Sequence, residues 1–195
     1  MADIKTFPQQ RYSGGAMAFH WTMAILIAAV GIMGLLFDDM PKAWKGPLVN
    51  LHVVLGVTII ALLAGRIWWR FTHRPPPLPA GTTPLNRQLS SLGHLALYGL
   101  MALVPLAGLS YQLARGRGID FYLFQVAPLM DRLPDIARPL RGVHSLSADA
   151  LMLLALGHMA LALWHQYVMR DGLMARMMPA GAPATMAAKK PVSLK

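Results

Sequence analysis

The chain has 195 residues, of which 55% are hydrophobic and only 13% are charged, whereas a typical soluble domain carries roughly 25% charged residues. Too few charged side chains remain to coat a soluble globule, and the absence of cysteine excludes disulfides, iron–sulfur clusters and other thiolate-held centres. The formal net charge of +10 does not indicate nucleic-acid binding, because the lysines and arginines stand at the ends of apolar runs, as membrane topology requires.

Four apolar stretches follow one another along the chain, and each reaches the ~18 residues that mark a transmembrane helix. Arg74 and the three prolines after it end the second stretch, and Thr83-Pro84 supplies a cap and first turn for the third. The alternating pattern of a membrane barrel is absent. The sequence therefore predicts an all-α fold, an integral membrane four-helix bundle, with helices at about 16–37, 48–70, 89–114 and 143–169.

The distribution of basic residues predicts the orientation of the bundle. Eleven Lys and Arg residues lie at the end that holds the two termini and the second connection, and seven lie at the other end, mixed with aspartates. The positive-inside rule then places both termini in the cytoplasm and the loop 115–142 in the periplasm. We expect residues 1–179 to form one transmembrane domain and residues 180–195 to be a disordered cytoplasmic tail.

Six of the seven histidines lie in the predicted helices, where ionisable side chains are costly and usually functional. Haem held by two histidines in a bundle needs imidazoles from different helices at one depth. At 1.5 Å of rise per residue, His52 and His144 lie roughly 4–8 Å from the periplasmic end. His20 and His158 lie about 27 and 26 Å from that end, counted from Asp38 and Arg141.

The angle between the two histidines of the fourth helix agrees with these depths. His144 and His158 are fourteen residues apart, so their side chains point within about 40° of the same direction and lie some 21 Å apart along the helix axis. One helix can therefore offer a ligand to each of two stacked haems. The predicted pairs are His52 with His144 for the periplasmic-side haem iron, and His20 with His158 for the cytoplasmic-side haem iron.

For the remaining polar residues of the predicted helices, the sequence leaves more than one role open. His165, about 36 Å from the periplasmic end, is too deep to pair with His20, and His94, at about 32 Å, is an imperfect match. A packing role is the simpler interpretation of both, although His94 would also suit a place near a quinone or a haem propionate. Arg66 and Arg70 are candidate propionate contacts or positive-inside anchors. Asp149 would carry protons or form a hydrogen bond within the bundle.

Several segments, in this order and spacing, resemble the bacterial cytochrome b561 family. The resemblance covers roughly residues 11–179 and rests on these segments: Phe19-His20-Trp21, Leu51-His52-Val53, Arg66 to Arg70, Gly93-His94 through Gly108, then His144, His158 and His165, and last Arg176 to Pro179. It implies a four-helix protein of the bacterial inner membrane that contains two haems b. It also implies axial ligands at His20, His52, His144 and His158, and ubiquinone as the redox partner.

The resemblance leaves two functions open. At least one family member looks like a superoxide oxidase, which passes electrons from superoxide at the periplasmic face to ubiquinone. The loop 115–142 has five Arg and three Asp, and a positive rim of this kind would steer superoxide or dock an acidic redox protein. Ser145 follows His144 where related sequences carry a carboxylate. The alternative is a non-catalytic conduit that relays quinol electrons to a partner protein, and a haem-free structural or transport bundle is a third interpretation.

Overall fold

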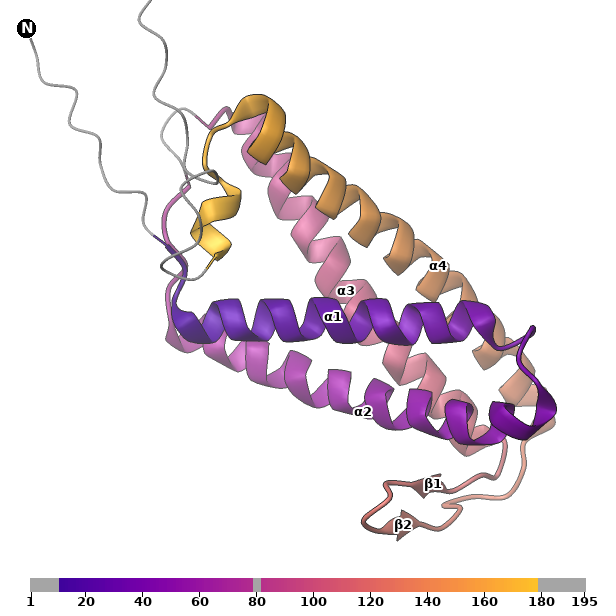
Figure 1. Ribbon diagram of the computed structural model, residues 1–195. Coiled ribbons are helices and arrows are strands. Elements are labelled where there is room, and N and C mark those ends of the chain that lie inside the picture. Colours follow the sequence, from indigo (N-terminus) through magenta and orange to yellow (C-terminus); the bar gives the residue numbers. More distant parts are fainter. Residues whose placement is uncertain (1–10, 79–81, 179–195) are drawn as a thin grey trace, which may run out of the picture.

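The structure is a computed structural model that describes residues 11–78 and 82–178, and four long helices make up most of it (Figure 1). Helix α1 spans Gly14–Leu36, α2 spans Lys42–Thr72, α3 spans Pro84–Ala114 and α4 spans Pro134–Trp164. All four are long and apolar enough to cross a membrane. The prediction of four long apolar helices is thus confirmed, and the predicted tail at 180–195 lies outside the described residues.

All four helices begin earlier than hydropathy predicts, α1 by only two residues. Helices α2, α3 and α4 start six, five and nine residues before the expected positions, and Pro47 and Pro139 lie inside α2 and α4. A proline near the start of a helix removes only one main-chain hydrogen bond, so both helices continue through it. Hydropathy marks the part of a helix that lies in lipid, whereas the helix itself extends past it and carries charged residues.

The helices pack as two antiparallel pairs, α1 with α2 and α3 with α4, and the pairs cross one another (Figure 1). The buried core cluster consists of Met23 from α1 with Ile59 and Leu63 from α2, and Tyr98 and Met101 from α3 pack against it. Only eight hydrophobic residues of the described chain are buried, while most large apolar side chains face outward. An apolar exterior of this kind is what a bundle surrounded by lipid requires.

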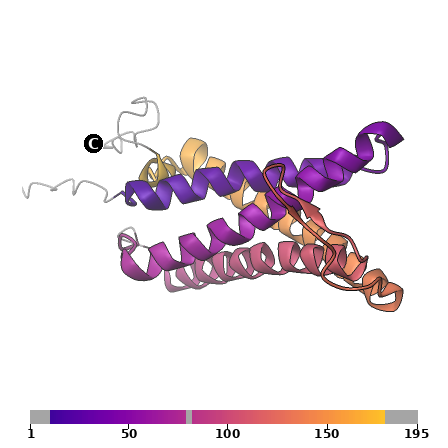
Figure 2. The ribbon, with the colours of Figure 1, turned by 90° about the horizontal axis from the view of Figure 1, so that it is seen from below.

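A short hairpin lies beside α2, at the end of the molecule opposite the start of α1 (Figures 1 and 2). Its strands are β1 (Ile119–Asp120) and β2 (Gln125–Val126), paired antiparallel with Ile119 opposite Val126. The Asn50 side chain of α2 donates from Nδ2 to the Asp120 carbonyl at 2.8 Å, and the Asp120 N–H donates to Asn50 Oδ1 at 3.2 Å. The hairpin is therefore tied to α2 two residues before His52, and we call this end of the bundle the hairpin end.

The opposite end of the bundle, called the termini end below, is closed by the last described residues. After α4 the chain forms a π-helix, His165–Met169, and a 3₁₀ turn, Met174–Met177. The Tyr12 N–H donates to the Arg176 carbonyl at 3.0 Å, and Trp21 Nε1 donates to the Met177 carbonyl at 2.8 Å. These bonds join the segment after α4 to the start of α1.

We expect Arg176→Ala to lower the free energy of unfolding by about 1.5–3 kcal/mol, the usual contribution of a hydrogen bond to a charged group. Arg176 is only 5% exposed, and its Nη2 donates to the Pro77 carbonyl at 2.6 Å. Thermal unfolding in detergent, followed by circular dichroism, measures the loss. The control is Arg170→Ala, because Arg170 is exposed and donates to the Tyr167 carbonyl of its own turn. Equal destabilisation by both variants would contradict the prediction.

Candidate functional site

At the hairpin end, two of the predicted histidines face each other across the bundle. The ring centroids of His52 on α2 and His144 on α4 are 6.0 Å apart, with the ring planes at 86°. His144 Nδ1 lies 2.8 Å from the Val104 carbonyl of α3, and it must be the donor because a carbonyl only accepts. The lone pair of His144 is therefore on Nε2, which is free to bind a metal.

At the termini end, His20 on α1 and His158 on α4 form the second predicted pair, with ring centroids 6.4 Å apart. Arg66 of α2 lies beside them, because its Nη2 is 3.4 Å from His20 Nδ1 and its Nε donates to the Tyr98 hydroxyl at 2.8 Å. The structure thus brings each predicted pair together, one pair towards each end of the bundle, as residue counting predicted.

His94 of α3 is a third histidine at the termini end. Its ring centroid is 5.5 Å from that of His158, and its Nδ1 donates to the Ser90 carbonyl at 2.6 Å. Residue counting put His94 about 5 Å deeper than His20, because it treats all helices as upright and equally placed. Crossing helices break that assumption, so a three-histidine cluster appears where the sequence predicted a pair.

The two arginines predicted near the haem line one cleft at the termini end. The cleft lies between the start of α1 and the end of α2, and its lining includes Arg66, Arg70, Tyr98 and Trp69. Trp69 stacks on His73, with ring centroids 3.8 Å apart, and donates to Ser13 Oγ at 3.0 Å. Arg66 is partly buried and Arg70 is exposed, so Arg66 is the one that faces the histidine cluster.

The spacing of the two pairs fits a haem iron between each pair of imidazoles. A metal–nitrogen bond of about 2 Å, and about 1 Å more from each nitrogen to its ring centre, puts two axial imidazoles about 6 Å apart between centroids. Haem supplies its own four in-plane nitrogens, so two histidines suffice. Among the described residues no group of three or more His, Cys, Asp or Glu is placed to hold a bare metal ion, and this includes the cluster of His20, His94 and His158.

Unused polar atoms and open space support the same fit. His52 Nδ1 is buried and has no hydrogen-bond partner among the described residues. A Cβ added at Gly56, one turn after His52, would meet nothing within 4 Å. The bundle thus leaves room near the hairpin-end pair for a group that the protein does not itself supply.

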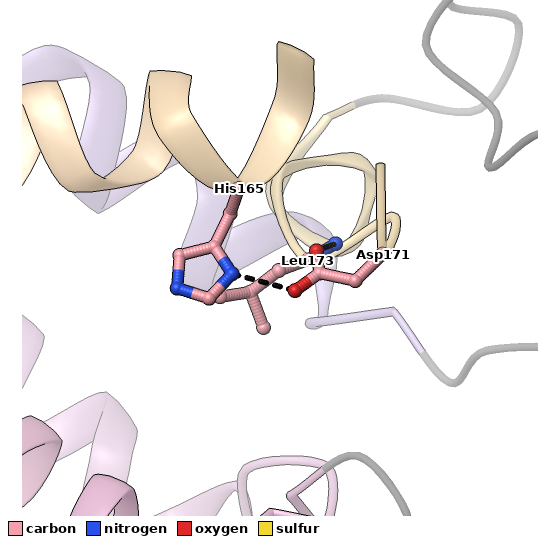
Figure 3. A network of polar contacts seen from close by, with 3 residues as sticks. All are labelled: His165, Asp171 and Leu173. Carbon is pink, nitrogen blue, oxygen red and sulfur yellow. Dashed lines mark hydrogen bonds and ion pairs between the residues drawn. The ribbon is translucent and has the colours of Figure 1, made fainter. Parts of the chain in front are cut away.

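His165 and Asp149, the two other ionisable residues of the fourth span, take no part in either pair. His165 Nδ1 lies 2.5 Å from Asp171 Oδ2, and Asp171 Oδ1 accepts from the Leu173 N–H at 3.0 Å (Figure 3). Sequence spacing could not find this contact, because it depends on the π-helix and on the left-handed Arg170 that turns the chain back. Asp149 is exposed on α4 and makes no hydrogen bond within the bundle.

We expect Gly108→Ala to disturb the hairpin-end histidines, although alanine favours a helix by about 0.5–1 kcal/mol over glycine. A Cβ at Gly108 would lie 2.8 Å from Cε1 and Nδ1 of His144, so the ring must move from the Val104 carbonyl. The reduced-minus-oxidised absorption spectrum should show a loss or shift of one haem component. Gly99→Ala, on the same helix with nothing within 4 Å of the new Cβ, should leave the spectrum unchanged. Identical spectra for both variants would refute the prediction.

Known proteins are similar in sequence to this chain over most of its length. The chain is 34% identical over 176 residues to cytochrome b562 of Cereibacter sphaeroides, covering 86% of this chain and 94% of the relative. It is 29% identical over 173 residues to cytochrome b561 homolog 2 of Escherichia coli, covering 87% and 92%. It is 27% identical over 172 residues to the probable superoxide oxidase CybB of Yersinia pestis, covering 87% and 97%. Residues 11–180 match the family described as prokaryotic cytochrome b561, and the chain, a multi-pass membrane cytochrome, belongs to that family.

Proposed function

We propose that this cytochrome holds two haems b and passes electrons across the bacterial inner membrane, from superoxide at the periplasmic face to ubiquinone. The observation that carries the proposal is the presence of two histidine pairs, one towards each end of the bundle, with ring centroids 6.0 and 6.4 Å apart. Bound haem would supply an iron that gains and loses single electrons.

The ligands in this proposal are His52 with His144 at the hairpin end, and His20 with His158 at the termini end. The Val104 carbonyl accepts a hydrogen bond from His144 Nδ1 and holds the ring in one orientation, as hydrogen-bond partners of metal-binding histidines generally do. Arg66, and at the open side of the cleft Arg70, would neutralise the haem propionates at the termini end.

The excess of Lys and Arg at the termini end supports a cytoplasmic position for both termini and a periplasmic position for the hairpin. The segment 115–142, which comprises the loop after α3 and the first residues of α4, has five Arg and three Asp, and this net positive charge attracts an anion such as superoxide. In the balanced reaction two superoxide anions are oxidised to dioxygen, and one ubiquinone takes up two electrons and two protons.

The test begins with purification in detergent and measurement of haem per chain. Two b-type haems per chain are expected, and none would return the protein to a structural or transport role. Superoxide consumption is then measured with and without ubiquinone in liposomes. Consumption should require the quinone and should slow as ionic strength rises, because salt screens the attraction of superoxide to the basic loop. Equal rates of superoxide consumption with and without ubiquinone would overturn the proposal.

The conduit to a partner protein is the second candidate, and the hairpin tip favours it. Tyr122, Leu123 and Phe124 are 62%, 94% and 60% exposed beyond the strands, and such a tip suits contact with another protein. If ubiquinol reduces the haems and the protein does not consume superoxide, this candidate is supported over the first.

A further inference from the structure

The outer face of α4 carries an aspartate that the electron-transfer function does not use. Asp149 is the only acidic residue between Val143 and Met169, and it lies about 12 Å along the helix from Arg141. It is exposed, and no described side chain forms a hydrogen bond or ion pair with it. An acid inside the apolar part of a membrane span is costly unless it has a polar partner.

Asp149 points away from the rest of the bundle. It lies about 140° around the helix from His144 and about 180° from His158, the two side chains that face inward. It is also about 160° from Ser147, which is buried. Its neighbours on the same face, Leu146 and Leu153, are 73% and 74% exposed. Figure 1 shows α4 at an edge of the molecule, and the exposure of Leu146, Asp149 and Leu153 leaves this face open to whatever lies beside the bundle.

A second transmembrane helix is the partner that relieves this cost, because helices in lipid associate through hydrogen bonds between polar side chains. The partner must present its polar group at the depth of Asp149. Two copies of one chain insert in the same direction, so a twofold axis along the membrane normal sets every residue at the depth of its counterpart. A second copy therefore meets the depth requirement automatically, whereas an unrelated helix would need a donor at the same level.

We propose that the outer face of α4, centred on Asp149, is the interface between two copies of this chain. Across the axis the two Asp149 carboxyl groups share a proton and form a hydrogen bond. Ser145 lies on the same face one turn earlier. Its O–H donates to the Gly142 carbonyl, so its oxygen is available as an acceptor for the other copy. Leu146 and Leu153 pack around this polar centre.

The absence of cysteine in the chain makes disulfide cross-linking a clean test. Leu146→Cys, Ala150→Cys and Leu153→Cys are made one at a time and oxidised in native membranes. At least one should give a covalent dimer, because a disulfide needs Cα atoms about 4.4–6.8 Å apart. The matched control is Ile25→Cys on α1, which is 67% exposed and, by helical rise, lies at about the depth of Leu153, and it should stay monomeric.

A second substitution tests the role of the carboxyl group. In the variant that cross-links, Asp149→Leu should lower the yield of dimer about threefold or more, the factor that matches an average interhelical hydrogen bond. Asp149→Asn, which still forms hydrogen bonds, should retain most of it. Haem content reports folding and should not change, since Asp149 points outward. Absence of cross-links at all three positions, equal yield from Ile25→Cys, or cross-links only to a different protein would each overturn the proposal.

Discussion

His144→Ala is expected to leave one haem per chain in place of two, and to abolish quinone-dependent superoxide consumption. Even the loss of a residue that merely orients a metal ligand costs about 10–100-fold in metal affinity, so loss of the ligand itself should cost more than about 100-fold. His144 faces only His52 at the hairpin end, and the described part of the chain brings no third histidine to that pair. No substitute is available when the imidazole is removed.

The measurement is haem per chain, together with the reduced-minus-oxidised spectrum of the purified protein. The termini-end haem should remain, because about 21 Å of helix separates His144 from His158. The control is His165→Ala, since the His165 imidazole is engaged by Asp171 and not by either pair. Loss of haem from His165→Ala, with His158→Ala retaining both haems, would refute the ligand assignment.

His20→Ala is expected to remove the termini-end haem, whereas His94→Ala should retain both. Both rings lie near His158: the ring centroid of His20 is 6.4 Å from that of His158, and the ring centroid of His94 is 5.5 Å from it. The larger separation is closer to two metal–nitrogen bonds plus the two ring radii, about 6 Å. His20 also lies beside Arg66, the arginine best placed to neutralise a propionate.

Haem stoichiometry and the spectrum of each variant decide between the two rings. His158→Ala serves as the reference, because it removes the shared ligand under either assignment. Loss of the haem from His94→Ala but not from His20→Ala would show that His94 is the ligand and that the depth estimate for α3 was in error. Loss from both single variants would mean that His94 positions the site even though His20 ligates the iron.

The bundle and its two histidine levels could be predicted from the sequence because both depend on properties local to one helix. An apolar run of sufficient length identifies a span, and the rise of 1.5 Å per residue converts sequence separation into depth. His144 and His158 lie on one helix, so the distance between them and the direction of their side chains could be predicted without knowing where the other three helices lie. Helix ends were predicted less well, because helices continue beyond lipid into the charged segments at Lys42 and Pro134.

Contacts between distant parts of the chain were decided only by the tertiary structure. The crossing of the helix pairs brings His94 to His158, a side-chain hydrogen bond holds the hairpin against Asn50, and a turn after the π-helix sets Asp171 on His165. The structure likewise leaves Asp149 exposed on α4, whereas the sequence analysis kept open a hydrogen bond within the bundle. Hydropathy and helical rise describe each helix by itself, whereas the tilt of a helix and its rotation about its own axis depend on how the side chains of different helices fit together.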